Sequence, residues 1–375
     1  MLRSRGSAHK EAMSIPQTLS RADLLAIWPD YMPTPLVSEP GLAAAAGVGQ
    51  VLLKLEGHRP FGNFKALGGM IAGLKAIGRA VHAPSLAGLI ARPRAYGPLP
   101  GLLCASDGNH GLAVAAAAAR VGAHASIYLP VSVPQARSDR IEALGGEVIR
   151  IDGTYDDAVE AAERAGRRGR GLLVPDTSQV DSQAVRDVMA GYSVLTREIT
   201  RAVADAVQDP PTHQFIQAGV GGLAAAMAQG LGSGTPSGPQ LIVVEPVTAA
   251  CVARALQVGR CEKAPGDLRT SADMLSCGLA SAPALAVLLS HGARAVTVDE
   301  GQLGHAVDLL QRMTGVETTA SGAAGLAGLM AVAGNPAARD RHALSIESRV
   351  LLVVTEGSGH HAATEPSTPV DRPVP

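Results

Sequence analysis

Lys65 lies between an apolar, strand-like run at residues 51–55 and a helix-like apolar spacing at residues 70–77, and its amine could react with a carbonyl compound. Phe64 and Leu67 flank this lysine, so we expect the amine to be buried. Burial penalises an unpaired ammonium, which should lower the pKa of the amine and leave a neutral nucleophile. The alternative is a lysine whose stem packs on the helix while its charge stays in water.

A second segment, residues 104–111, combines the end of an apolar strand with small polar residues and the start of a helix. The carboxyl ends of parallel strands are where α/β sheets bind ligands. Asn109 could donate or accept a hydrogen bond there, close to the free N–H groups of the helix start. Asp107 could take part in chemistry or could simply cap the helix.

A third segment is a glycine-rich loop between a predicted strand and a predicted helix, with the residues Gly219, Val220, Gly221, Gly222 and Leu223. Glycines let backbone N–H groups close around an anion, and the dipole of the following helix favours the negative charge. The loop lacks the Lys-Ser/Thr pair of a nucleotide P-loop and the spacing of a dinucleotide-binding motif. We therefore expect a phosphate monoester, although a tight turn could use the same glycines for packing alone.

The composition is that of a globular protein that does not bind nucleic acid. Apolar residues make up 46% of the 375 residues, whereas aromatic residues make up 2% and the net charge is −1. Few aromatic platforms and no basic excess argue against nucleic acid as a partner. The sequence shows no signal peptide and no apolar run long enough to span a bilayer. The four cysteines lack the spacing of a disulfide framework, so we expect a soluble, cytoplasmic protein with reduced thiols at Cys104, Cys251, Cys261 and Cys277.

Strand-like and helix-like patterns alternate along the chain, which predicts parallel sheets with crossover helices. We expect an α/β fold with two lobes, each a mostly parallel sheet flanked by helices. The predicted strands are residues 51–55, 102–105, 125–129, 147–151, 171–174, 214–217, 241–245, 295–298 and 349–354. The predicted helices are residues 41–46, 111–120, 134–144, 155–167, 183–206, 223–231, 248–257, 301–313 and 322–334.

The two lobes define the expected domains. We predict a large domain formed by residues 16–100 and 186–361, and a small domain formed by residues 101–185. Both ends of the chain lack apolar periodicity, so residues 1–15 and the proline-rich residues 362–375 are expected to be disordered. Residues 79–100 are rich in proline and glycine and are predicted to form an insert or a lid-like loop.

A reactive amine, a helix start that carries an amide and a phosphate-binding loop are together what pyridoxal 5′-phosphate requires. On these motifs the chain resembles the fold type II pyridoxal-phosphate enzymes, the group of tryptophan synthase β, cysteine synthase, threonine synthase and the serine and threonine ammonia-lyases. The resemblance extends over residues 33–357, nearly all of the chain between its two ends. Further motifs occur in the order found in the family: Pro33-Thr34-Pro35-Leu36, Lys54-Leu55-Glu56-Gly57, Val244-Glu245-Pro246 and Ser321-Gly322-Ala323-Ala324-Gly325.

The resemblance implies a role for each chemical segment. Lys65 matches the lysine that binds the aldehyde of the cofactor, Asn109 matches the asparagine that holds the ring hydroxyl, and residues 219–223 match the phosphate loop. The large domain is then the cofactor-binding domain. At the end of the last core strand, Thr355 or Ser358 is the candidate partner of the ring nitrogen. A neutral hydroxyl at that position favours elimination or replacement at the β-carbon.

Several details are similar to the diaminopropionate ammonia-lyase branch of this family. Residues 106–111 resemble that branch's Thr-Asp-Gly-Asn-His-Gly, and Asp176-Thr177 and Thr355-Glu356-Gly357 also match it. The resemblance implies that Asp107 is the base toward the D-substrate, that Lys65 serves the L-substrate, and that Asp176 helps to bind the substrate. A substrate with a second ammonium group needs a negative partner, which gives the acidic pair a physical reason. Asp176 could alternatively be a capping residue.

Three departures from the branch concern the substrate more than the cofactor. The chain has Thr319-Ala320 where the branch usually has a glutamate before Ser-Gly-Ala, and Ser358-Gly359-His360 where it usually has Asp-Thr-Asp. Phe61-Gly62-Asn63 also differs from the usual run before the lysine. No metal is expected, because the adjacent His360 and His361 have no third ligand at suitable spacing.

The expected activity is therefore β-elimination of ammonia from 2,3-diaminopropionate, yielding pyruvate. One alternative within the family is an ammonia-lyase acting on serine, threonine or hydroxyaspartate, or an enzyme that replaces the β-substituent. An alternative of a different class is a catalytically inactive regulatory protein that binds pyridoxal phosphate. The resemblance also implies a homodimer.

Overall fold

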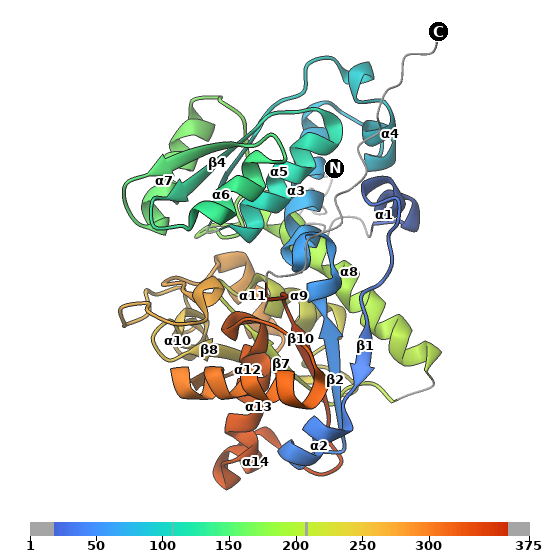
Figure 1. Cartoon of the computed structure of the whole chain (residues 1–375), viewed down its shortest axis with the longest axis vertical. Helices are drawn as coiled ribbons and strands as arrows, with labels where there is room; N and C mark the ends of the chain where they lie inside the picture. Colours follow the sequence, from blue (N-terminus) through green and yellow to red (C-terminus); the bar gives the residue numbers. More distant parts are fainter. Residues whose placement is uncertain (1–18, 107, 207–208, 359–375) are drawn as a thin grey trace, which may run out of the picture.

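The computed structural model of the chain describes residues 19–106, 108–206 and 209–358. Asp107, His360 and His361 therefore lie outside the described residues, as do the expected disordered segments 1–15 and 362–375. Figure 1 shows two lobes, with β4, α5, α6 and α7 in the upper lobe and β7, β8, β10 and α13 in the lower lobe. The described part of the chain contains no helix that is long and apolar enough to cross a membrane.

The larger sheet has six strands, all parallel to their neighbours except the antiparallel edge pair β1 and β2. Their order in space is β1 (Leu36–Ser38), β2 (Gln50–Leu55), β10 (Arg349–Val354), β7 (His213–Gln217), β8 (Gln240–Pro246) and β9 (Arg294–Val298). Because consecutive side chains point to opposite faces of a strand, a continuous apolar run such as that of β10 must be covered on both faces. Leu351 and Val353 accordingly pack into one core cluster, and Val350, Leu352 and Val354 into another.

Helices cover the two faces of this sheet. The second of these clusters also contains buried side chains of α2 (Pro40–Ala46), α12 (Glu300–Thr314) and α13 (Ala320–Ala333), and α14 (Pro336–His342) packs on α13. The first contains side chains of α1 (Arg21–Ile27), α8 (Gln183–Asp205), α9 (Gly222–Gly230), α10 (Cys251–Val258) and α11 (Ala282–Ser290).

The smaller sheet is parallel throughout, in the order β5 (Glu147–Ile151), β4 (Ala125–Pro130), β3 (Leu102–Ala105) and β6 (Leu172–Leu173). Leu103 and Ala105 of β3 pack against α7 (Tyr155–Arg167). Leu102 and Cys104 face the core that contains α5 (Asn109–Val121) and α6 (Gln135–Glu142). The expected α/β architecture with helices flanking mostly parallel sheets is thus confirmed.

Helix α3 (Lys65–Ala80) lies between the lobes and packs against both α5 and α8. Its crossing with α8 is close because Gly191 has no side chain: a Cβ there would come within 2.5 Å of the Leu67 carbonyl oxygen. This packing holds the start of α3, and with it Lys65, against the larger lobe.

Two helices begin earlier than the apolar periodicity indicates. The apolar spacing of residues 70–77 predicted only the middle of α3, which begins at Lys65. The pattern of residues 111–120 likewise missed the start of α5, which begins at Asn109. Polar first residues do not contribute to an apolar pattern, so the pattern underestimated both helices. The two residues singled out for their chemistry are therefore each the first residue of a helix.

The prediction of a lid-like loop at residues 79–100 was wrong. Helix α3 continues to Ala80, and α4 (Leu86–Ala91) follows, with Leu89 fully buried in the core. Leu86 and Leu89 are three residues apart and share one apolar helical face, a signal that the prolines and glycines around them obscured.

The two sheets follow the predicted division into domains. The strands of the larger sheet come from both predicted parts of the large domain, and those of the smaller sheet come from the predicted small domain. The domain boundaries stay a prediction.

Candidate active site

Lys65 is placed by a tight turn that is fastened to the end of β10. Asn63 accepts from the Lys65 backbone N–H at 3.0 Å and donates to the Phe61 carbonyl at 2.9 Å. Phe61 has φ of +67°, a conformation that costs a non-glycine residue about 1–2 kcal/mol. The Phe64 N–H donates to the Thr355 carbonyl at 3.1 Å. The turn thus holds the lysine next to residues that follow the last strand.

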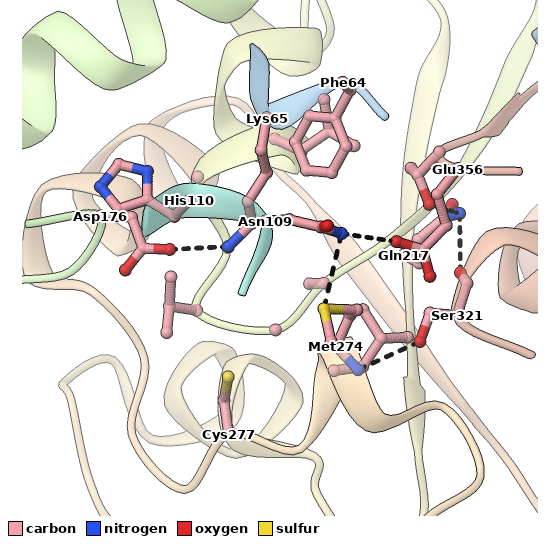
Figure 2. Close-up of a pocket in the computed structure, with 18 of the residues that line it drawn as sticks. Phe64, Lys65, Asn109, His110, Asp176, Gln217, Met274, Cys277, Ser321 and Glu356 are labelled. Atoms are coloured by element: carbon pink, nitrogen blue, oxygen red, sulfur yellow. Dashed lines mark hydrogen bonds and ion pairs between the residues drawn. The ribbon is translucent and has the colours of Figure 1, made fainter. Parts of the chain in front are cut away.

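The side chain of Lys65 reaches across the cavity to Asp176 of the smaller lobe. Its Nζ donates to Asp176 Oδ2 at 2.7 Å, as Figure 2 shows. Asp176 Oδ1 accepts from the hydroxyl of Tyr155, the first residue of α7, at 3.2 Å. Both carboxylate oxygens of Asp176 thus contact side chains of the cavity wall, which supports the prediction of a functional carboxylate over that of a helix cap.

This ion pair reverses the expected direction of the lysine pKa. Burial acts to lower the pKa of Lys65, but the Asp176 carboxylate outweighs burial and raises it. Burial likewise acts to raise the pKa of Asp176, and the Lys65 ammonium holds it well below its ordinary range. The expectation of a lowered lysine pKa was wrong, because it considered burial without this partner, which lies 111 residues away in the sequence.

Asn109 enters the same cavity from the start of α5. The preceding turn is held by Ser106, whose Oγ accepts from the N–H groups of Gly108 at 2.9 Å and Gly111 at 2.8 Å. Asn109 Nδ2 donates to Glu356 Oε2 at 2.8 Å and lies 3.6 Å from Met274 Sδ (Figure 2). The amide nitrogen therefore faces Glu356 and Met274, two residues that also line the cavity. Asp107, the other candidate of this segment, lies outside the described residues.

The glycine loop forms another part of the cavity wall. Residues Gly219, Val220, Gly221, Gly222 and Leu223 all line it. Gly221 has φ of +97°, a conformation that L-residues with side chains rarely adopt. Helix α9 begins directly afterwards, and the first N–H groups of a helix have no acceptor within the helix. The loop therefore presents backbone donors to a ligand in the cavity.

The two hydroxyl candidates are separated by the structure. Thr355 lines the cavity, and its Oγ1 accepts from Gln217 Nε2 at 3.2 Å, which leaves the Thr355 hydrogen available for a ligand. Ser358 donates to Glu317 Oε2 at 3.2 Å and is not among the described residues that line the cavity. Of the two candidates, Thr355 is the one that lines the cavity, and its role toward the ring nitrogen stays a prediction.

Sequence reasoning missed several residues of the cavity wall. The sequence predicted no chemistry for Glu356, Gln217 or Tyr155. A carboxylate directly after a buried apolar strand was a usable signal for Glu356. Tyr155 carried no local signal, because its contact with Asp176 depends on how α7 packs. The other missed residues of the wall are Phe64, Ser106, Gly108, His110, Tyr192, Ala218, Met274, Leu275, Cys277 and Ser321.

The cavity has the donor set that a phosphate-bearing aldehyde needs. It includes the amine of Lys65, the side-chain amide of Asn109, the hydroxyl of Thr355 and the backbone N–H groups at the start of α9. A Cβ at position 219 would come within 3.0 Å of Cys277 Sγ and 3.2 Å of the Met274 carbonyl, so the loop fits closely against the cavity wall as glycine. These residues fit pyridoxal phosphate.

Comparisons with known proteins agree with this donor set. The family described as "Pyridoxal-phosphate dependent enzyme" matches residues 27–356. The chain is 30% identical to a diaminopropionate ammonia-lyase from Escherichia coli (strain K12) over 87% of this chain and 85% of that protein. It is 29% identical to a probable D-serine dehydratase from Pseudomonas paraeruginosa (strain DSM 24068 / PA7) over 84% of this chain and 74% of that protein.

Solved structures show the same architecture. Holo diaminopropionate ammonia lyase from Escherichia coli superposes with a TM-score of 0.80 at 28% identity, covering 92% of this chain and 91% of that chain. A threonine deaminase from T.th. superposes with a TM-score of 0.71 at 25% identity, covering 92% of this chain and all of the other. The expected fold type II architecture and the expected cofactor, pyridoxal phosphate, are thus confirmed. The chain belongs to the family of pyridoxal-phosphate dependent enzymes.

Proposed function

We propose that the protein eliminates ammonia from 2,3-diaminopropionate and releases pyruvate. The observation that carries this proposal is the ion pair between Lys65 and Asp176 in the cavity that Asn109 and the glycine loop also line. The similarity to diaminopropionate ammonia-lyases over most of both chains supports it. The overall reaction consumes one water and yields pyruvate and two ammonia molecules.

We propose a holding role for each donor of the cavity. When bound, pyridoxal phosphate supplies an aldehyde that bonds to amino groups and a ring that withdraws electrons from the substrate α-carbon. Lys65 would bond to the aldehyde, and residues 219–223 would bind the phosphate. Asn109 would donate to the ring hydroxyl, and Thr355 would donate to the ring nitrogen. A hydroxyl, unlike a carboxylate, leaves that nitrogen largely unprotonated.

The charge balance around Asp176 supports a dicationic substrate. Asp176 balances the Lys65 ammonium at 2.7 Å. Once Lys65 bonds to the aldehyde, its ammonium charge no longer faces Asp176, and the buried carboxylate requires another cation. The second ammonium of 2,3-diaminopropionate meets that requirement, whereas the hydroxyl group of serine or threonine does not.

Lys65 and Asp107 are the proposed bases that remove the α-proton. The amino group of the substrate would first take the place of Lys65 on the aldehyde, which releases Lys65 as a free amine. Lys65 would then act on the L-substrate and Asp107 on the D-substrate. The electron pair of the broken C–H bond would then expel the β-amino group as ammonia, and hydrolysis of the remaining three-carbon unit would yield pyruvate and the second ammonia.

Turnover of a substrate panel tests the proposal. The purified protein should form pyruvate and ammonia from 2,3-diaminopropionate, with a smaller kcat/KM for serine, threonine and hydroxyaspartate. Lys65→Ala should lose both this turnover and the visible absorbance of the bound cofactor, whereas Lys263→Ala, which changes an exposed lysine, should retain both. Preferential turnover of serine or threonine would favour the alternative ammonia-lyase. Absence of turnover with a normal cofactor spectrum would favour a regulatory protein.

The role of Asp107 is tested with the two stereoisomers. Asp107→Asn should reduce turnover of the D-isomer about a hundredfold or more and affect the L-isomer much less, because a positioned base contributes about that factor. Equal losses for both isomers would eliminate the two-base scheme.

We also propose the assembly and domains that the family resemblance implies. The large cofactor-binding domain would comprise residues 16–100 and 186–361, and the small domain residues 101–185. The separate sheets of the two lobes support this division. A cytoplasmic homodimer is the proposed state, which sedimentation analysis and cell fractionation would test.

A further inference from the structure

Glu356 is a buried carboxylate on the cavity wall to which the proposed reaction assigns no task. Its side chain has two partners: Oε2 accepts from Asn109 Nδ2 at 2.8 Å, and Oε1 accepts from Thr319 Oγ1 at 2.6 Å. Its backbone carbonyl accepts from Thr318 Oγ1, and it pairs with Asn63 in an isolated β-bridge. Glu356 is thus held from three directions, and Figure 2 shows Nδ2 of its partner Asn109 turned toward both Glu356 and Met274.

Among the described residues, no cation forms an ion pair with Glu356. Burial raises the pKa of this carboxyl group, against the hydrogen bonds from Thr319 and Asn109 and the charge of Arg137, which act to lower it. Burial of a carboxylate is costly, so the hydrogen bond from Asn109 stabilises Glu356 and at the same time holds the Asn109 amide in place. The lysine charge of the cavity is balanced elsewhere, by Asp176.

The two hydrogens of the Asn109 amide nitrogen indicate what the contact with Glu356 does. An amide nitrogen has two hydrogens. One is donated to Glu356, and the other lies near the thioether of Met274 at 3.6 Å, which is a weak acceptor. An anionic oxygen entering the cavity would readily replace the thioether. If the amide were flipped, its oxygen would face the Glu356 carboxylate, an unfavourable contact between two acceptors.

We propose that Glu356 is a positioning residue that fixes the orientation of the Asn109 amide, so that its second N–H is presented to the ring oxygen of pyridoxal phosphate. Glu356 acts through Asn109 and need not touch the cofactor. This inference depends on the cofactor and not on the identity of the substrate, so its test is independent of the turnover of diaminopropionate.

The test measures the visible absorbance of the cofactor in the holoenzyme and the affinity of the cofactor-free protein for pyridoxal phosphate. Glu356→Leu should weaken binding of pyridoxal phosphate about tenfold or more, because a hydrogen bond to a charged oxygen is lost when the amide is free to rotate. The visible absorbance should also shift to shorter wavelength, because the ring oxygen loses a donor that stabilises its anionic form. Glu356→Gln retains an acceptor oxygen and should restore both properties to near those of the unchanged protein.

Two further variants separate positioning from general destabilisation. Glu245→Leu makes the same chemical change as Glu356→Leu at a buried carboxylate that accepts from the N–H groups of Val252 and Ala253, and it should leave the absorbance position unchanged. In an Asn109→Ala background, Glu356→Leu should cause no additional loss of cofactor affinity, because two residues that act as one unit are not additive.

Two results would overturn the proposal. One is an unchanged spectrum and affinity in Glu356→Leu; the other is a loss in Glu356→Leu that adds fully to that of Asn109→Ala. If Glu356→Leu does not fold, Thr319→Val decides the matter. It removes the donor to Glu356 Oε1 and also the acceptor of the Gly322 N–H at the start of α13, whereas Thr319→Ser keeps both and serves as its control. For Thr319→Val we then expect a smaller spectral shift in the same direction, and an unchanged spectrum would refute the positioning role.

Discussion

At the scale of single residues, the state of Lys65 depends on one carboxylate. The carboxylate of Asp176 raises the pKa of the lysine despite burial, and the ammonium in turn lowers the pKa of Asp176. The lysine is therefore held charged until an incoming group replaces it as the partner of Asp176. In the proposed function, this exchange would link attachment of the cofactor to recognition of the second ammonium group of the substrate.

Asp176→Asn tests whether Asp176 recognises the second ammonium group of the substrate. We expect kcat/KM for 2,3-diaminopropionate to fall about thirtyfold or more, since removing one member of a buried charge pair costs about 2–5 kcal/mol. The loss for serine, which lacks the second ammonium, should be smaller. Steady-state kinetics with both substrates measure the difference, with Asp157→Asn, an exposed helix-capping carboxylate, as the control. Equal losses for both substrates would show that Asp176 does not recognise the second ammonium.

At the scale of elements, the site is assembled from the starts of three helices. Helix α3 begins at Lys65, α5 at Asn109 and α9 at Gly222, and all three starts line one cavity. The unpaired N–H groups and the dipole of a helix start favour anions, which suits a phosphate and a ring oxygen. The last strand, β10, ends at the same cavity with Thr355 and Glu356.

Gly221→Ala tests the proposal that the glycine loop binds the phosphate. An alanine at φ of +97° is strained, and its Cβ would lie 3.3 Å from Val252 Cγ2, so the start of α9 should shift. We expect the affinity for pyridoxal phosphate to fall about tenfold, measured by titration of the cofactor-free protein, with a stability loss of about 1–2 kcal/mol. Gly259→Ala is the matched control: its φ is +76°, and a Cβ there meets nothing within 4 Å. A similar loss of cofactor affinity in both variants would contradict the assigned role of the loop.

At the scale of the whole molecule, a buried ionic cluster joins segments that are distant in the sequence. Glu198 of α8 accepts from Lys54 of β2 at 2.6 Å and from Arg59 at 2.8 Å. Arg59 also pairs with Glu56 at 2.7 Å, in the turn that leads to Lys65. All four side chains are buried, so the cluster must be complete to be stable. It fixes the turn before Lys65 to α8.

Glu198→Gln should therefore destabilise the protein in a pH-dependent way. Burial acts to raise the pKa of Glu198, but the Arg59 hydrogen bonds outweigh it and the pKa is lowered from its ordinary value of 4.5. The stabilisation is thus present above pH 4.5 and is lost as the pH falls below it. At neutral pH the free energy of unfolding should fall by about 3–5 kcal/mol.

Denaturant unfolding at several pH values measures this effect. The difference between the unchanged protein and Glu198→Gln should shrink as the pH falls below the ordinary glutamate pKa. Glu160→Gln, which breaks an exposed pair with Arg164, should change stability by less than about 1 kcal/mol at every pH. A pH-independent difference for Glu198→Gln would mean that the carboxylate contributes through packing alone.

The amino-acid sequence by itself determined the alternation of strands and helices, the order of the chemical segments and the cofactor. These properties depend on local periodicity and on short motifs, which a sequence records directly. The positions of Lys65, Asn109 and the glycine loop after strands already indicated one ligand-binding edge.

Tertiary structure alone decided which partners these residues have. Asp176 lies 111 residues from Lys65, and Glu356 lies 247 residues from Asn109, yet each pair is within hydrogen-bond distance. The lysine pKa was mispredicted for this reason, and Glu356 was overlooked. An apolar pattern reports that a surface is buried but not which surface covers it, so contacts between lobes, and the pKa values that depend on them, follow only from packing in three dimensions.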